Sequence, residues 1–210
     1  MIEMSKVLLI NGSPNAQGNT WTALNEVADA LEKHRVETEL LYLGKQPIAG
    51  CIACYKCVKA GKCVFDDQVN QVIEKLDSYD GIIIGSPVYF AGPNGHLCAF
   101  LDRLFWAGGK RLAGKLAAAV VCCRRGGASA ALDRLNRYLT YSNMCVVGSS
   151  YWNMVHGMKP GEVKEDLEGM HTMRTLGENM AWMLKNMEAG KNEGVPGPEY
   201  ERKVFTNFIR

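Results

Sequence analysis

Residues 7–20 read Val-Leu-Leu-Ile-Asn-Gly-Ser-Pro-Asn-Ala-Gln-Gly-Asn-Thr, and the fold follows from this stretch. Its first part, Val7 to Asn11, is a continuous apolar run, which is typical of a strand buried on both faces of a parallel sheet. A helical period then begins, because apolar side chains recur at three-to-four spacing over residues 19–34. A strand, a short polar loop and a helix in this order indicate an α/β sheet.

The same alternation continues along the chain. Further strands are predicted at 36–43, 81–86, 116–123 and 144–148, and further helices at 66–76, 94–106, 128–141 and 166–188. The sequence therefore predicts one α/β domain over residues 1–190, with a doubly wound, five-stranded parallel sheet in three α/β/α layers. Residues 191–210 carry Val204, Phe205, Phe208 and Ile209 beyond a glycine- and proline-rich stretch, which predicts a tail that docks on a partner subunit.

Composition and charge exclude several classes of protein. The net charge of +2 and the absence of a basic stripe argue against a nucleic-acid-binding surface. The N-terminus has no signal-peptide pattern, and no apolar stretch approaches the roughly 18 residues of a membrane helix. Eight cysteines without an export signal favour the reducing cytoplasm, where thiols bind metal or stay free. We expect a cytoplasmic protein with neither nucleic-acid nor membrane partners.

The loop between the first strand and the first helix is a candidate phosphate site. Ligands of open α/β sheets bind at the carboxyl ends of the strands, and a helix N-terminus there offers free N–H groups to an anion. The loop lacks Gly-Lys-Ser/Thr and Gly-x-Gly-x-x-Gly, so it predicts one terminal phosphate rather than a triphosphate or a dinucleotide. A polar loop that merely caps the helix through Asn19 or Thr20 is the alternative. The residues expected at the phosphate are Ser13, Pro14, Asn15, Gly18, Asn19 and Thr20.

A second loop, over residues 85–94, follows the third predicted strand at the same edge of the sheet. Tyr89 and Phe90 are adjacent aromatic residues between two prolines. The backbone of Pro87, Val88, Tyr89 and Phe90 could meet the polar edge of a ring system, and the aromatic side chains its face. Alone, such aromatics are more often packing residues. Beside a phosphate loop they indicate a mononucleotide with a planar head group, and Gly126, in the loop after the fourth strand, completes the candidate site.

Half of the cysteines lie within thirteen residues, at Cys51, Cys54, Cys57 and Cys63. Three thiolates at two-residue intervals, with a fourth close behind, can surround one iron–sulfur cluster, as in the bacterial ferredoxin run. The run departs from that pattern because five residues precede the fourth cysteine and Val64 follows it. A zinc site, which usually joins two separated cysteine pairs, a labile disulfide and four free thiols are the alternatives.

Together these residues resemble the NADPH-dependent FMN reductase-like branch of the flavodoxin-like superfamily. The matching segments are Gly12-Ser-Pro, Gly18-Asn-Thr20 and Ser86-Pro-Val-Tyr89. With the four cysteines and Asp66-Asp67 added, the chain is similar to the iron–sulfur flavoproteins within that branch. The resemblance implies a flavodoxin-like fold, one FMN and one [4Fe–4S] cluster per subunit, and a homodimer or homotetramer.

The resemblance also implies a flavin-dependent oxidoreductase. Electrons would pass from NAD(P)H or ferredoxin through FMN and the cluster to a small-molecule or protein acceptor. No catalytic acid or base is required, because the cofactor carries the chemistry. The alternatives are an NAD(P)H-dependent FMN, quinone or azo reductase without a cluster, and a non-catalytic electron carrier. The net charge of +2 counts against the carrier, since flavodoxin carriers are usually strongly acidic.

Overall fold

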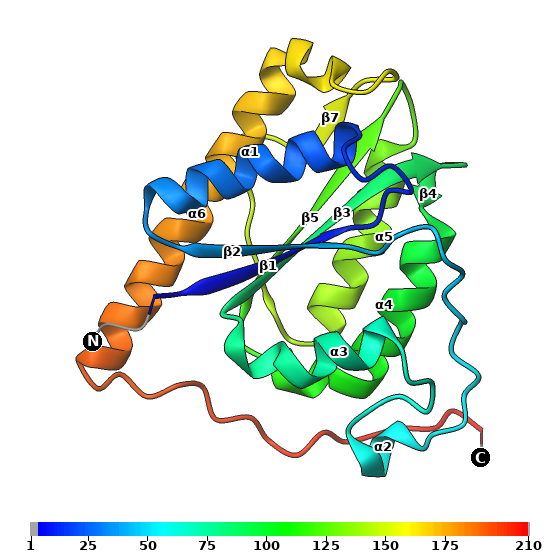
Figure 1. The fold of residues 1–210 in the computed structure, drawn as a ribbon. Helices are drawn as coiled ribbons and strands as arrows, with labels where there is room; N and C mark the ends of the chain where they lie inside the picture. Colours follow the sequence, from blue (N-terminus) through cyan, green and yellow to red (C-terminus); the bar gives the residue numbers. More distant parts are fainter. Residues whose placement is uncertain (1–3, 210) are drawn as a thin grey trace.

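The structure, a computed structural model, describes residues 4–209 and consists of one sheet between two layers of helices (Figure 1). The strands are β1 (Lys6–Asn11), β2 (Glu37–Tyr42), β3 (Gly81–Tyr89), β4 (Gly92–Pro93), β5 (Leu116–Cys123), β6 (Cys145–Val146) and β7 (Met154–His156). The order β2-β1-β3-β5-β6 is parallel throughout, whereas β4 pairs antiparallel with the end of β3. This is the flavodoxin-like strand order, and the predicted fold is confirmed.

Five helices of eight residues or more cover the two faces of the sheet. The helices α1 (Asn19–Lys33) and α6 (Leu167–Asn192) lie on one face, and α3 (Gln68–Lys75), α4 (Gly95–Gly108) and α5 (Ala128–Tyr141) lie on the other (Figure 1). The short elements are α2 (Cys57–Ala60) and the 3₁₀ turns η1 (Leu76–Ser78), η2 (Gly109–Leu112) and η3 (Glu162–Glu165).

The core explains why the strands read as continuous apolar runs. On β3, Ile82 and Ile84 pack beneath α3, α4 and α5, while Ile83 packs beneath α1 and α6. All three are fully buried, because both faces of the sheet are covered. On the second face α6 approaches α1 closely at Gly177, where an added Cβ would lie 2.5 Å from the Cβ of Ala30.

The fifth strand predicted at 144–148 is present as β6, although β6 is only two residues long. It pairs with the start of β5, and a further strand that was not predicted, β7, pairs with the end of β5. Between them the chain leaves the sheet. There the Ser149 hydroxyl donates to the Tyr151 carbonyl and contacts Asn153 Oδ1, so local side-chain hydrogen bonds replace the ladder.

Two other segments differ from the predicted boundaries. β3 continues past residue 86 to Tyr89 and turns back through Phe90 and Ala91 into β4, so the aromatic loop is a hairpin. Phe90 and Ala91 have φ of 51° and 60°, as a two-residue type I′ turn requires. The cysteine segment, expected as a loop, contains the helix α2, and α6 continues to Asn192, two residues beyond the predicted domain end.

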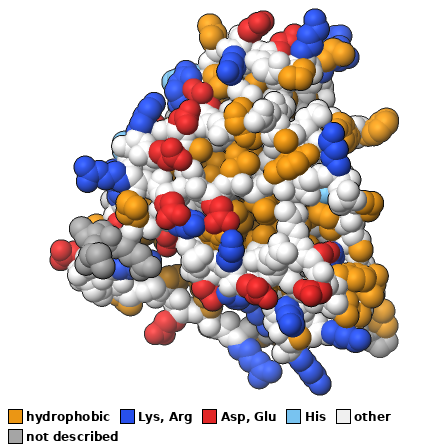
Figure 2. Space-filling model, in the orientation of Figure 1, with side chains coloured by type: hydrophobic (Ala, Val, Ile, Leu, Met, Phe, Trp, Pro, Cys, Tyr) orange, Lys and Arg blue, Asp and Glu red, His pale blue; other side chains and the backbone are white. Residues whose placement is uncertain are grey.

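Over residues 193–209 the chain has no helix or strand and runs back past the lower helices toward α2 (Figure 1). The Lys203 ammonium lies 4.3 Å from the centre of the Tyr141 ring. Figure 2 shows hydrophobic side chains gathered at the lower right of this face, where Figure 1 places α2 and the end of the tail. Within residues 4–209, every helix is too short or too polar to cross a bilayer.

Candidate functional site

The loop between β1 and α1 is held from two sides by hydrogen bonds. The Asn11 side chain accepts from the Ser13 N–H (3.0 Å) and donates to the Ala16 carbonyl (3.2 Å). From the neighbouring strand, the Tyr42 hydroxyl donates to the Pro14 carbonyl (2.7 Å). Sequence reasoning missed Asn11 and Tyr42 as supports, because neither side chain carries a local signal for a contact across the loop. The loop is therefore shaped before any ligand binds.

The N-terminus of α1 has no side-chain cap. Its N-cap residue is Gly18, so the alternative in which Asn19 or Thr20 caps the helix was wrong. Side chains do cap α3, α4 and α6, whereas α5, which begins after Gly127, is uncapped like α1. The short helix α2 also lacks a side-chain cap, but only α1 and α5 begin at loops of the candidate site, where an uncapped first turn leaves N–H groups for an anion.

The side chains beside this N-terminus fit a phosphate. Asn19 Oδ1 is buried and has no hydrogen-bond partner, and because it is an acceptor it can be satisfied by a donor group of a ligand but not by a phosphate oxygen. The Ser13 hydroxyl accepts from the Asn15 N–H (3.1 Å), so its proton is free to be donated to a phosphate oxygen. The Thr20 methyl group faces Gly85, where an added Cβ would lie 3.0 Å from it. Thr20 therefore joins the loop to β3.

Asn94 ties the phosphate loop to the hairpin. Its Nδ2 donates to the Gly12 carbonyl (2.9 Å), and its backbone N–H donates to Ser86 Oγ (3.0 Å). Its Oδ1 accepts from the His96 N–H (2.9 Å) and so caps α4. The bond to Gly12 spans 82 residues and carries no local signal in the sequence. One buried side chain thus sets the relative position of two loops.

The hairpin tip and the loop after β5 meet at Gly127. Gly127 has φ of 87°, and an added Cβ would lie 2.7 Å from Ala91 Cα. Gly126 has open space around it, and Phe90 projects entirely into solvent. Non-glycine residues at positive φ, such as Phe90 and Ala91, cost of order 1–3 kcal/mol each and persist where neighbouring structure enforces them. The predicted ring-binding residues thus lie on a strained and supported hairpin.

All the predicted nucleotide residues lie at one edge of the sheet, at the carboxyl ends of β1, β3 and β5 (Figure 1). The chain reverses its direction of winding between β1 and β3, which is where ligands of such sheets bind. A fourth segment, after β7, was missed. Gly157 donates its N–H to the Cys123 carbonyl (3.0 Å), and an added Cβ there would lie 3.0 Å from Asn19 Nδ2.

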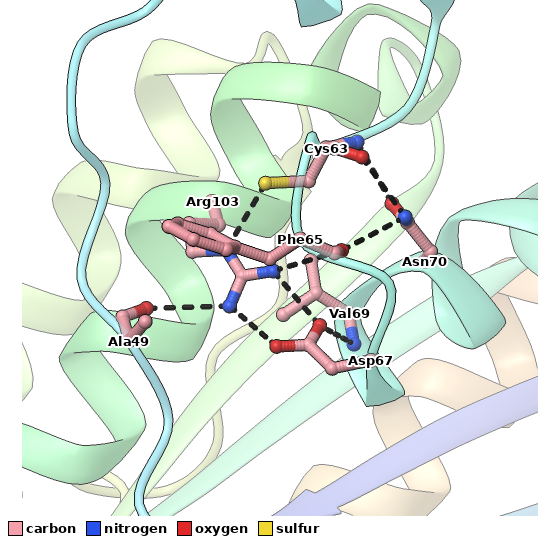
Figure 3. A network of polar contacts seen from close by, with 7 residues as sticks. All are labelled: Ala49, Cys63, Phe65, Asp67, Val69, Asn70 and Arg103. Carbon is pink, nitrogen blue, oxygen red and sulfur yellow. Dashed lines mark hydrogen bonds and ion pairs between the residues drawn. The ribbon is translucent and has the colours of Figure 1, made fainter.

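The four clustered cysteines line a single pocket at a separate place in the fold. Asn70 fixes the last of them: it accepts from the Cys63 N–H (2.8 Å) and donates to the Cys63 carbonyl (3.0 Å) (Figure 3). The buried Arg103 donates from Nε to Cys63 Sγ (3.2 Å). Burial, then the neighbouring thiols Cys54, Cys63 and Cys51, raise the pKa of Cys57.

Each of the eight cysteines is a free thiol. Among residues 4–209, no three Cys, His, Asp or Glu side chains are close enough to hold one metal ion.

Comparison with known proteins shows which family and which solved structures the chain resembles. Residues 5–159 match the NADPH-dependent FMN reductase family. An iron–sulfur flavoprotein of Methanocaldococcus jannaschii is 35% identical over 188 residues, covering 86% of this chain and 97% of the relative. An iron–sulfur flavoprotein of Methanosarcina thermophila is 26% identical over 192 residues, covering 90% and 100%. The crystal structure of RosB with bound 8-demethyl-8-formylriboflavin-5′-phosphate superimposes with a TM-score of 0.68 at 18% identity, covering 98% and 93%, which shows the shared fold.

The region that matches the family contains the phosphate loop, the hairpin, the loop after β5 and the cysteine segment. These are the segments that the structure arranges into the two candidate sites. The chain therefore belongs to the family of NADPH-dependent FMN reductases and related iron–sulfur flavoproteins, and it is an FMN-dependent oxidoreductase.

Proposed function

We propose that the protein passes electrons between a reduced donor, FMN and a [4Fe–4S] cluster held by Cys51, Cys54, Cys57 and Cys63. The observation that carries the proposal is the single pocket lined by all four of these cysteines. The relatives in Methanocaldococcus jannaschii and Methanosarcina thermophila, which match most of this chain, are named iron–sulfur flavoproteins.

The chemistry of the pocket fits a cluster. A cubane takes four thiolates, and the pocket offers one from each of its four cysteines. Arg103 supplies a positive charge beside Cys63, which favours an anionic group. Phe65 and Trp106 also line the pocket and keep its walls apolar. Low polarity around the sulfurs strengthens these charge interactions.

The other site fits FMN. When bound, FMN supplies the hydride and single-electron chemistry of the reaction. The first-turn N–H groups of α1, with the Ser13 hydroxyl, would hold the phosphate. The hairpin from Pro87 to Phe90 would carry the ring, and the uncapped start of α5 beside Gly126 would offer N–H groups to negative charge on it. No side chain is needed as a proton donor.

Electrons enter from NAD(P)H or ferredoxin and leave to a small-molecule or protein acceptor. Exposed apolar side chains near the cysteine segment support a protein partner at the cluster: Ile52, Tyr55, Val58 and Trp106 are each more than half exposed. Contiguous apolar surface of this kind commonly marks an interaction site. The homodimer or homotetramer and the cytoplasmic location remain predictions from the sequence.

The cluster is tested by replacing one pocket cysteine and one cysteine outside the pocket. Cys57→Ser removes a ligand from the segment, whereas Cys145→Ser changes an exposed thiol on β6. All variants are purified and reconstituted without oxygen, and iron and flavin are quantified. We expect about four iron per chain, as a cubane requires, in the wild type and Cys145→Ser, and loss of most of it in Cys57→Ser.

FMN content should be the same in all three proteins, because the cysteine pocket and the FMN loops use different residues. Equal iron in Cys57→Ser and the wild type would contradict the assignment of the ligands. A wild type with FMN and without iron would support the reductase that has no cluster.

A further inference from the structure

Arg103 is the largest fully buried side chain in the part of the chain that the structure describes. It extends from α4 toward the cysteine segment, and its side chain is 1% exposed. A buried cation is costly unless it is paired and fully hydrogen-bonded. The contacts that compensate this charge therefore show what the residue holds in place.

Asp67 neutralises the guanidinium with a two-pronged contact. Arg103 donates from Nη1 to Asp67 Oδ2 (2.7 Å) and from Nη2 to Asp67 Oδ1 (2.8 Å). Asp67 also accepts from the Val69 N–H (3.1 Å), so it caps α3 as well. This pair fixes the guanidinium in one orientation between α3 and α4, as bidentate carboxylate contacts do.

The remaining donors of Arg103 reach both ends of the cysteine segment (Figure 3). Nη1 donates to the Ala49 carbonyl (3.2 Å), two residues before Cys51. Nη2 donates to the Phe65 carbonyl (3.3 Å), two residues after Cys63. Nε donates to Cys63 Sγ (3.2 Å), so all five N–H groups of the guanidinium are used. One side chain thus closes the segment into a loop and also contacts a sulfur.

Charge and stacking agree with this role. Burial by itself would lower the pKa of Arg103, but hydrogen bonds to Asp67 and Cys63 raise it above its ordinary value, so the cation persists. The guanidinium carbon also lies 4.9 Å from the centre of the Phe65 ring. A lysine cannot reproduce this arrangement, because its single nitrogen lacks the planar fork.

We propose that Arg103 is the positioning residue of the cysteine site: it closes the segment between Ala49 and Phe65 and donates a hydrogen bond to the Cys63 sulfur. The second half of this role rests on the proposed function, since it concerns the bound cluster. A donor to a ligand sulfur stabilises the more negative, reduced cluster and raises its reduction potential. Closure of the segment concerns the metal-free protein as well.

The test compares Arg103→Lys with Arg111→Lys. Arg111 is the control: it also contacts a carboxylate with two nitrogens, Nε and Nη2 to Asp77 (2.9 and 2.5 Å), and donates to the Ile73 carbonyl (2.6 Å), away from any sulfur. In the reconstituted protein, Arg103→Lys should shift the reduction potential of the cluster to more negative values. It should also release iron to a chelator about tenfold faster or more, as is usual when a supporting contact is lost. Arg111→Lys should match the wild type in both.

Hydrogen exchange of the backbone amides of residues 49–65 in metal-free protein provides the independent readout. Exchange there should be faster in Arg103→Lys and unchanged in Arg111→Lys. If the wild type takes up no iron, the cluster assignment fails, but this exchange still decides whether Arg103 closes the segment. The proposal is overturned if Arg103→Lys exchanges like the wild type, or if a bound cluster keeps its potential. Should Arg103→Lys not fold, Asp67→Asn, which loses the orienting carboxylate, should shift all three measurements in the same direction.

Discussion

At Gly127 a single residue connects the sheet to the proposed FMN site. Its φ of 87° is strained for any side chain, and an added Cβ would meet the backbone of Ala91. Gly127→Ala should therefore lower the free energy of unfolding by about 1–3 kcal/mol, the usual cost of such strain. It should also weaken FMN binding, because the hairpin tip would shift. Urea unfolding of the flavin-free protein and FMN titration measure the two effects.

The neighbouring Gly126→Ala separates stability from binding. Gly126 has no atom within 4 Å of an added Cβ, and its backbone is not left-handed. The free energy of unfolding should change by less than about 0.5 kcal/mol, as for other unstrained surface positions, while FMN binds more weakly if the ring lies against this residue. Equal destabilisation by both substitutions would refute the contact between Gly127 and Ala91.

Single residues were predicted from the sequence only where a local pattern marks them. The cysteines and the loop residues Ser13, Asn19 and Tyr89 could be named, because their spacing or their neighbours indicate a ligand. The bond from Asn94 to Gly12 and the pairing of Arg103 with Asp67 join residues 82 and 36 positions apart. Such contacts depend on how the helices pack, so the sequence alone could not predict them.

Among the elements, α1 is the helix whose N-terminus we expect to bind the phosphate of FMN. The double substitution Asn19→Ala and Thr20→Ala removes two polar side chains at an uncapped helix N-terminus. Hydrogen bonds to a charged group contribute about 1.5–3 kcal/mol each, so FMN affinity should fall tenfold or more. Fluorescence titration of flavin-free protein with FMN measures this.

Asn25→Ala provides the control on the same helix. Asn25 is half-buried and donates to the Trp21 carbonyl (2.8 Å), beyond the first turn of α1. Its replacement should leave FMN affinity unchanged. If the double variant also binds FMN like the wild type, the phosphate does not lie at this helix.

Helices and central strands were predicted well because their periods are local properties of the sequence. β1, β3 and β5 are buried on both faces, so each reads as an uninterrupted apolar run. The fifth strand was predicted in the right place but too long, and β7 was not predicted, because the extent of both strands depends on where β5 offers partners. The extension of β3 into a hairpin likewise requires a turn at Phe90 and Ala91 that the usual Asn-Gly signal does not mark.

For the molecule as a whole, we predict that the tail beyond α6 contributes to the assembly of subunits. Val204, Phe205, Phe208 and Ile209 remain between 79% and 95% exposed although the tail runs along the protein. Burial of this apolar surface by a partner subunit would be favourable. We therefore expect a variant that ends at Asn192 to form smaller assemblies than the full chain in light scattering after size-exclusion chromatography. If the shortened variant has the same number of subunits per assembly as the full chain, the tail has no role in assembly.

More of the overall architecture than of the two sites could be predicted from the sequence. Alternating strands and helices indicate the doubly wound sheet, and that sheet brings the loops after β1, β3 and β5 to one edge. The convergence of four cysteines on one pocket was expected from their spacing. Its dependence on α4, which supplies Arg103, and on α3, which supplies Asn70, emerges only in three dimensions.

The central claim is that this FMN-dependent oxidoreductase also carries a [4Fe–4S] cluster. The most direct measurement is the absorbance spectrum of protein purified without oxygen, with iron, sulfide and FMN quantified on the same sample. We predict flavin bands over broad absorption near about 400 nm, with about four iron and four sulfide per chain, as a cubane requires. Flavin bands without iron or sulfide would contradict the claim and leave the four cysteines as free thiols.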